Sequence, residues 1–118
     1  EWVVNKVKIA INDFLQAHPD KRVEDITIAC FGLAFKPDID DLRESPAMNI
    51  TRRITQLHQG RVLAVEPNIQ VLPDELCELV STTEALLELD IAVLLVDHKE
   101  FKRIMFAGNY LVDTKGIW

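Results

Sequence analysis

The sequence predicts an α/β fold in which a parallel β-sheet is covered by helices on both sides. Short, almost wholly apolar runs alternate along the chain with segments whose apolar residues recur every three or four positions. Such apolar runs are typical of parallel strands that are buried on both faces, and their alternation with helices indicates right-handed crossover connections. At 118 residues, with 48% hydrophobic and 27% charged residues, the chain suits one domain with a substantial core.

The first predicted element is a helix over residues 1–17. Its apolar residues fall on one face, at spacings of three and four: Val3, Val4, Val7, Ala10, Ile11, Phe14 and Leu15. No capping residue precedes Trp2, so we expect the end of a longer helix that joins two domains. Pro19 disfavours helix at the residue before it and ends this helix. We therefore divide the chain into a helix end with its linker, residues 1–20, and a domain, residues 21–118.

Alternating strands and helices are predicted for the rest of the chain. The apolar runs predict strands over residues 26–34, 61–65, 91–96 and 110–112. Helical spacing predicts helices over residues 45–59 and 82–89, and a short helix after His98 that carries Phe101, Ile104 and Met105. The order of these elements predicts a Rossmann-like three-layer domain with a parallel sheet.

Capping and turn residues set several of these boundaries. Ser45 is predicted to cap the helix that begins at Pro46, because proline suits the first helical position. Gly60 is predicted to end the same helix. Within residues 70–81, Pro73 is predicted to open a short helix that carries Leu79.

Composition excludes several classes of function. The formal net charge of −6 argues against nucleic-acid binding, which needs a basic face. The longest apolar run, residues 91–96, is far shorter than the roughly 18 residues that a membrane span requires. Cys30 and Cys77 belong to no CxxC pair, and the three histidines lack metal-ligand spacing, so we expect small buried hydrophobes and no metal site. A reducing, cytoplasmic setting is the default for such a chain.

The loop over residues 35–44 is the first candidate for a binding site. It is longer than the two to six residues usual in α/β units, and it carries Lys36 and Arg43 among several acids. Both cations could hold a phosphate or carboxylate, and the planar fork of Arg43 suits bidentate recognition. Alternatively, they only offset the neighbouring acids, and Phe35 is either a core residue or a flat surface for a base. The loop lacks the GxGxxG spacing of a dinucleotide fingerprint.

Two more residues follow predicted strands and share that edge of the sheet. Lys115 comes just after the last strand, where it could approach the same crevice as Lys36 or remain a solvated lysine. His98 follows the third strand, but the sequence assigns it no serine or cysteine partner, so a nucleophilic triad is unsupported. We interpret it as an ordinary polar residue.

Sixteen contiguous residues, GLAFKPDIDDLRESPA from Gly32 to Ala47, carry a resemblance to a known family. They look like the signature of the C-terminal UDP-binding domain of the UDP-glucose and UDP-N-acetylmannosamine dehydrogenases. The rest of the chain is similar too. Glu66-Pro67 stands in the place of a usual aspartate-proline, and the segment from Asp97 to Phe101 stands where many members carry a tryptophan. Among the subfamilies, the chain is most similar to bacterial UDP-N-acetyl-D-mannosamine 6-dehydrogenases.

The resemblance implies a function for the longer protein and roles for particular residues. The family's enzymes oxidise the sugar C6 alcohol to a carboxylate in two steps with two NAD, through a catalytic cysteine. The resemblance places that cysteine and the main NAD-binding site in the other domains of the enzyme, so this fragment alone is expected to be inactive. Phe35 and Lys36 are implied to contact the UDP-sugar and Arg43 to reach towards NAD. Lys115 takes the place of a substrate-binding arginine, with its charge but without bidentate geometry.

Two alternatives stay open at this point. The same domain could come from a UDP-glucose 6-dehydrogenase, or it could be a non-catalytic nucleotide-binding or interaction module. The resemblance also implies a homodimer or higher homo-oligomer, formed through the central domain of the full enzyme. The sequence offers no residue that decides which sugar is oxidised.

Overall fold

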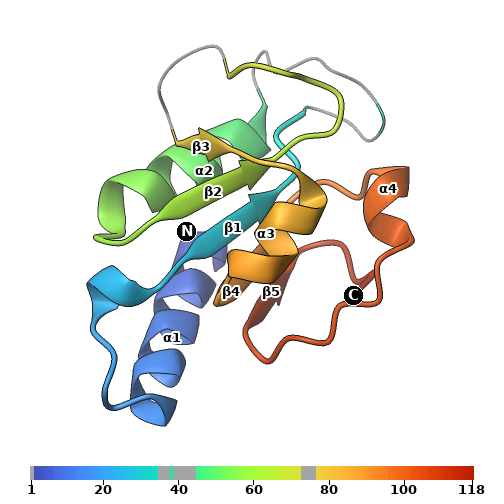
Figure 1. Ribbon diagram of the computed structural model, residues 1–118. Helices are drawn as coiled ribbons and strands as arrows, with labels where there is room; N and C mark the ends of the chain where they lie inside the picture. The colour runs from blue at the N-terminus through green and yellow to red at the C-terminus, as the bar shows by residue number, and fades with distance from the viewer. Residues whose placement is uncertain (1, 35–37, 39–44, 73–76) are drawn as a thin grey trace.

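The computed structural model describes residues 2–34, 38, 45–72 and 77–118. Five parallel strands form one sheet in the order β3-β2-β1-β4-β5 (Figure 1). In chain order the elements are α1 (Trp2–Ala17), a 3-10 turn (Val23–Asp25), β1 (Ile28–Phe31), α2 (Pro46–Leu57), β2 (Val62–Val65), β3 (Glu78–Leu79), α3 (Thr82–Glu88), β4 (Ile91–Leu94), α4 (Lys99–Lys102) and β5 (Leu111–Asp113). The predicted α/β fold with a parallel sheet is confirmed.

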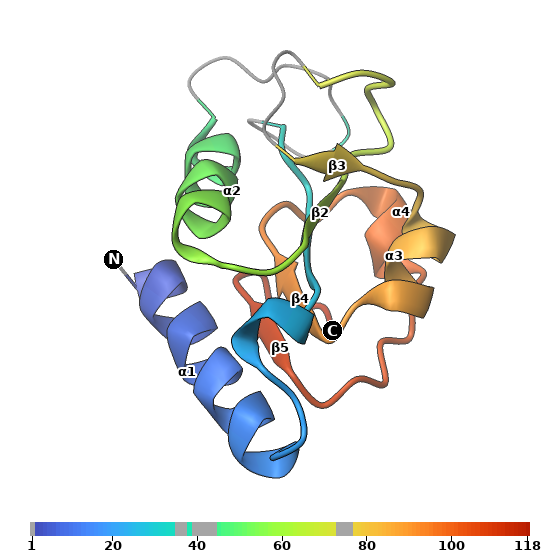
Figure 2. The ribbon, with the colours of Figure 1, turned by 60° about the vertical axis from the view of Figure 1, so that its left-hand side comes forward.

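Helices cover both faces of the sheet and complete three layers (Figure 2). On one face, α1 and α2 pack on alternate residues of the central strands, among them Ile28, Cys30, Ile91 and Val93. On the other face, α3 and α4 cover the residues between these, such as Phe31 and Leu94. Every residue of β1, β2 and β4 is therefore buried, which explains why these strands read as unbroken apolar runs.

Helix α1 confirms the predicted apolar face. Val3, Val4, Val7, Ile11 and Phe14 are buried. Trp2 and Ile9, in contrast, leave about half of their surface exposed, at 57% and 52%. One face of the helix therefore covers the sheet, and Trp2 and Ile9 form additional apolar surface that stays exposed beside this face.

The cap of α2 is confirmed, whereas its predicted end is wrong. The Ser45 hydroxyl accepts the Met48 N–H at 3.2 Å and donates to the Leu33 carbonyl at 2.6 Å. The helix ends at Leu57 with His58 as its C-cap, before Gly60 is reached. Gly60 is needed for a different reason, since a Cβ there would lie 2.5 Å from the Ile26 carbonyl oxygen.

Other predicted boundaries also need correction. Glu78–Leu79 forms a short parallel strand beside β2 where a helix was predicted, while residues 73–76 lie outside the described part. The predicted strand over 26–34 is shorter because Gly32 adopts a φ of +96°, which takes the backbone out of the ladder. The short helix predicted to carry Ile104 and Met105 ends before them, at Lys102, and Met105 is 96% exposed.

The chain end and Cys30 are part of the packed core, and Cys77 is partly buried against it. Trp118 stacks on Phe106 with ring centroids 5.2 Å apart and packs edge-on against Phe31 at 4.9 Å. Cys30 is fully buried, and burial raises the pKa of its thiol to about 12. Within the described ranges, no helix has the length and apolar character needed to cross a membrane.

Candidate functional site

The carboxyl edge of the sheet brings together loops from four strands. Phe31 pairs with Val65 of β2 and with Leu94 of β4, and Leu94 pairs with Asp113 of β5. The four strands therefore end at one level. The chain order of the sheet also reverses between β1 and β4, and in open α/β sheets ligands bind at this switch point, beyond the carboxyl ends of the strands.

At Gly32 the backbone leaves β1 and passes very close to the segment that follows β4. A Cβ at this position would lie 2.6 Å from the Val96 Cβ and 2.9 Å from the Val96 backbone nitrogen. Its φ of +96° is also a conformation that residues with a side chain rarely adopt. Leu33 and Ala34, which follow it, are buried although they belong to no strand.

A buried carboxylate, Glu66, ties the β1 loop to the end of β2. Its Oε1 accepts the backbone N–H groups of Leu33 and Ala34 at 2.9 and 3.0 Å. Its Oε2 accepts the backbone N–H and the side-chain amide of Asn68, both at 3.1 Å. Burial would raise the pKa of Glu66, but hydrogen bonds from His98 and from the Leu33 and Asn68 N–H groups outweigh burial and hold the pKa below its usual value.

His98, which follows β4, completes this network. Its side chain is fully buried, and its Nε2 lies 2.8 Å from Glu66 Oε1. Its Nδ1 lies 2.7 Å from the backbone nitrogen of Asp38. Because a backbone N–H can only donate, Nδ1 must accept, so His98 is neutral with its proton on Nε2 and donates that proton to Glu66.

Asp38 is held at both its backbone and its side chain. Its N–H donates to His98, and its Oδ1 accepts the N–H of Lys99 at the start of α4, at 2.8 Å. Its φ of 63° lies in the left-handed region, which aspartate tolerates better than most residues with a side chain. The loop after β1 is thus joined to the loops after β2 and β4.

The loop after β5 is organised around a second carboxylate. Asp113 accepts backbone N–H groups from Lys115, Gly116 and Trp118 at 2.7–2.8 Å. Partial burial would raise the pKa of Asp113, but these donors, with Trp118 first among them, hold it below its usual value. The side chain of Lys115 is exposed at this edge, beyond the outermost strand.

The site residues predicted from sequence divide into two groups. Phe35, Lys36 and Arg43 lie outside the described residues, so their predicted roles stay predictions. Lys115 lies on the predicted edge of the sheet, without a described contact to the network around His98.

The interpretation of His98 as an ordinary polar residue is wrong, and Glu66 was missed as its partner. The available signal was topological. Each residue lies just beyond a parallel strand, and those two strands flank β1, so their loops must meet at one edge.

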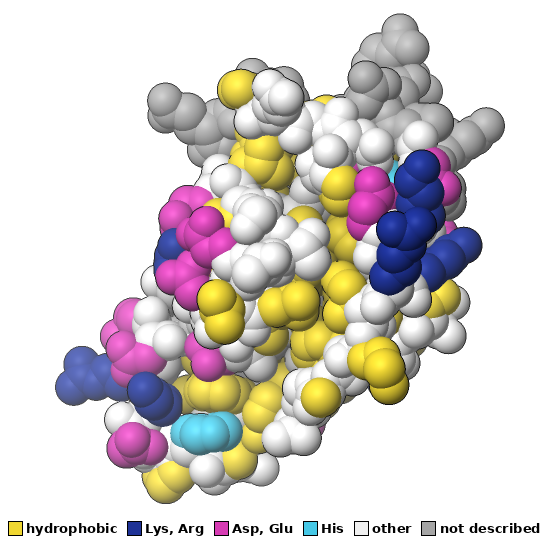
Figure 3. All heavy atoms as spheres, turned by 45° about the vertical axis from the view of Figure 1, so that its right-hand side comes forward, with side chains coloured by type: hydrophobic (Ala, Val, Ile, Leu, Met, Phe, Trp, Pro, Cys, Tyr) yellow, Lys and Arg dark blue, Asp and Glu magenta, His cyan; other side chains and the backbone are white. Residues whose placement is uncertain are grey.

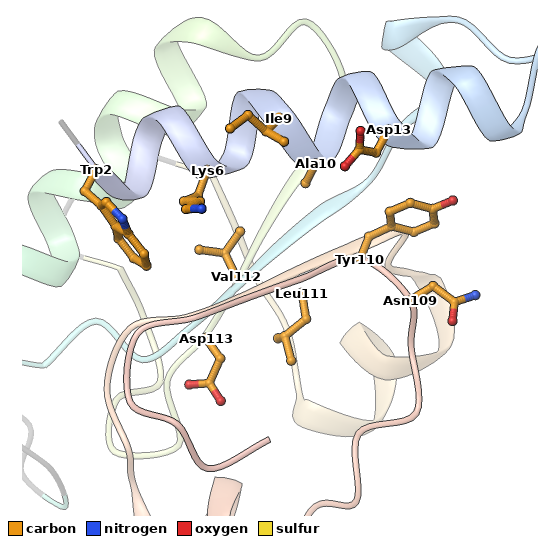
Figure 4. Close-up of a pocket in the computed structure, with 10 residues that line it drawn as sticks. All are labelled: Trp2, Lys6, Ile9, Ala10, Asp13, Asn109, Tyr110, Leu111, Val112 and Asp113. Carbon is orange, nitrogen blue, oxygen red and sulfur yellow. The ribbon is translucent and has the colours of Figure 1, made fainter.

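Surface depressions lined by described residues adjoin the sheet at its carboxyl edge and along β5. The first, about 390 Å³, lies at the carboxyl edge between the end of β2 and the start of α3, and Glu66, Ser81 and Thr82 are among the residues that line it. The second, about 430 Å³, is a groove between α1 and the edge strand β5 (Figure 4). Trp2, Lys6 and Ile9 line it on the helix side.

Basic side chains gather at the corner formed by α4 (Figure 3). Lys99, Lys102 and Arg103 are exposed there. In a chain with a formal net charge of −6, this local group favours an anion near the carboxyl edge. Within the described residues, no three His, Cys, Asp or Glu side chains gather in a way that could hold a metal ion.

Comparison with known proteins identifies the domain. A family model described as "UDP-glucose/GDP-mannose dehydrogenase family, UDP binding domain" matches residues 29–118. The chain belongs to this family. Proteins named UDP-N-acetyl-D-mannosamine dehydrogenase are 54% identical in Salmonella typhimurium and 53% identical in Escherichia coli K12, over 99% of this chain. The chain spans 29% of the length of these relatives.

Solved structures show the same fold. The UDP-N-acetyl-mannosamine dehydrogenase Cap5O from Staphylococcus aureus superimposes with a TM-score of 0.74 at 26% identity, over 98% of this chain and 26% of that one. A UDP-D-ManNAc dehydrogenase from Pyrococcus horikoshii, at 22% identity, also gives a TM-score of 0.74, over 99% of this chain and 27% of that one. The UDP-binding domain of the family therefore accounts for the fold of residues 29–118, and the similarity to the relatives extends over residues 1–28 as well.

The described residues of this domain do not fit a dinucleotide site of the usual Rossmann kind. In such sites an acidic residue beyond the second strand binds the ribose hydroxyls. Here the corresponding carboxylate, Glu66, accepts hydrogen bonds from Leu33, Ala34, Asn68 and His98. Both its oxygens are therefore occupied within the protein, and it has no capacity left for a ribose.

Proposed function

We propose that the full-length protein is an NAD-dependent UDP-N-acetyl-D-mannosamine 6-dehydrogenase and that this domain holds the UDP part of the substrate. The observation that carries the proposal is the identity of 53–54% to proteins named for this activity, across 99% of the chain. The carboxyl edge supports it, because the strand order reverses there and an open depression lies beside it.

Four residues are assigned to this site. We propose that Phe35, Lys36 and Lys115 bind the UDP-sugar and that Arg43 reaches towards NAD, which is held mainly by the rest of the protein. Binding energy from the UDP group, remote from the reacting carbon, can then position C6 of the sugar for oxidation. The fragment itself is inactive on this account. A reducing cytoplasm suits the thiols of Cys30 and Cys77, which form no disulfide in the described part of the chain.

Kinetics of the full-length protein test the substrate. Purified enzyme is supplied with NAD and, in parallel, UDP-N-acetylmannosamine, UDP-glucose and UDP-N-acetylgalactosamine. The last is included because a Ralstonia solanacearum protein named NDP-N-acetyl-D-galactosaminuronic acid dehydrogenase is 48% identical over 103 residues. We expect the highest kcat/KM with the mannosamine sugar and two NADH formed per sugar, since an alcohol becomes a carboxylate. A preference for another sugar would contradict the assignment.

A further inference from the structure

The Glu66–His98 pair lies where the loops of three adjacent strands meet. Both side chains are fully buried, and the pair is linked by one 2.8 Å hydrogen bond. The two side chains also accept hydrogen bonds from the backbone of the loop after β1, at two places. Glu66 accepts the N–H groups of Leu33 and Ala34, and His98 accepts that of Asp38. The residues between these two attachments are 35–37, which include two residues assigned to the UDP-sugar.

We propose that Glu66 and His98 are positioning residues for UDP-sugar binding. In this role, which rests on the proposed function, the pair fixes the residues on either side of the segment that carries Phe35 and Lys36. Because Ala34 and Asp38 are both held by hydrogen bonds, the two ends of the segment that joins them are fixed before the substrate binds. Substrate binding then loses less conformational entropy, which lowers KM.

Histidine suits this position because its ring can both donate and accept a hydrogen bond. One ring must donate to the Glu66 carboxylate and accept from the Asp38 N–H on opposite sides. Neutral imidazole has this donor and acceptor pair, which an apolar side chain lacks. For stability alone, replacing a buried polar pair by well-packed apolar residues is often neutral or favourable, so burial of this pair indicates a gain in conformational specificity.

Of the two hydrogen bonds that the His98 ring makes, the one to Asp38 acts directly on the loop after β1. Asp38 has a left-handed backbone with φ 63°, which needs support from its surroundings, and it receives that support at two atoms. One is the N–H bound by His98, and the other is the carboxylate that accepts the Lys99 N–H. The hydrogen bond from His98 Nε2 to Glu66, in contrast, satisfies a buried carboxylate. We expect its loss to lower mainly the stability of the fold.

Two substitutions of His98 distinguish the effect of its hydrogen bond with Asp38 from that of its hydrogen bond with Glu66. In His98→Asn the side-chain oxygen can take the place of Nδ1 and keep an acceptor for Asp38. In His98→Gln the amide nitrogen can take the place of Nε2 and keep a donor for Glu66. The full-length enzyme is measured with UDP-N-acetylmannosamine and NAD, together with its Tm and its Kd for UDP by calorimetry.

We expect opposite patterns in the two variants. His98→Gln keeps a Tm near that of the wild type but raises the KM for the UDP-sugar and the Kd for UDP by roughly five- to tenfold, with little change in the KM for NAD. His98→Asn lowers Tm but keeps the KM for the UDP-sugar near the wild-type value. A purely structural role predicts instead that KM rises only where Tm falls, and that result, or an unchanged KM in His98→Gln, would overturn the proposal.

A matched control comes from the other buried histidine. His58 is 7% exposed, and its Nε2 bonds the Ile26 carbonyl at 2.8 Å, at the opposite end of the sheet. His58→Ala should lower Tm without changing either KM. Should wild-type enzyme bind UDP but not oxidise the mannosamine sugar, the proposed substrate fails, while the Kd values for UDP still decide the role of His98.

Discussion

At the scale of single residues, the carboxyl edge depends on carboxylates that accept backbone N–H groups. Glu66 does so in full burial and Asp113 in partial burial, and in both cases the donors lower the pKa against the effect of burial. Hydrogen bonds to a charged acceptor are stronger than neutral ones, and they fix the geometry of each loop. Glu66 directly follows β2 and Asp113 is the last residue of β5, so the sheet itself places the charged groups that organise the edge.

The lowered pKa of Glu66 predicts an acid-dependent loss of stability. A folded pKa below the unfolded value of about 4.5 means that the carboxylate stabilises the fold fully above that pH and loses its contribution as pH falls through the folded pKa. Glu66→Gln should lower the free energy of unfolding by about 2 kcal/mol at pH 7. Urea titrations from pH 7 down to pH 3 should show this difference shrinking. Exposed Glu24→Gln is the control, and a difference that is constant with pH would refute the assignment.

At the scale of elements, helix starts are the most locally determined features. Ser45 and Ser81 each accept an N–H from the third residue that follows, as capping residues do. They differ in their surroundings, because Ser45 is buried and also donates to the Leu33 carbonyl, whereas Ser81 is exposed. Ser45 therefore links α2 directly to the exit of β1.

This difference predicts unequal costs for two similar substitutions. Ser81→Ala removes only a cap and should cost about 1 kcal/mol of unfolding free energy. Ser45→Ala also leaves a buried carbonyl without its donor and should cost about 2–3 kcal/mol. Chemical denaturation of both variants measures the difference. Equal losses would show that the bond to Leu33 contributes nothing to stability.

The elements that follow from local pattern were predicted, and those that depend on distant partners were not. Helix α1 and the cap of α2 were predicted because periodicity and capping are encoded within a few residues. Strand β3 was missed because two residues carry no period, and only pairing with β2 makes them a strand. The link from Glu66 to His98 joins residues 32 positions apart, and the one from His98 to Asp38 joins residues 60 apart. Neither spacing is visible in a sequence until the strand order is known.

At the scale of the whole molecule, the described residues form a surface for a ligand at the carboxyl edge of the sheet and another in the groove between α1 and β5. The carboxyl edge combines the switch point of the sheet, a polar network and the basic side chains of α4. The groove between α1 and β5 is of similar volume but lies along the open side of the sheet, against the exposed Trp2 and Ile9. Every proposed residue role depends on UDP binding at the carboxyl edge.

Hydrogen exchange of the full-length protein, measured by mass spectrometry with and without UDP, shows where UDP binds. We expect slower exchange in peptides that cover residues 32–38 and 95–99, and unchanged exchange across residues 109–112 in the groove. Slower exchange confined to residues 2–13 and 109–112, with the carboxyl edge unaffected, would contradict UDP binding at that edge.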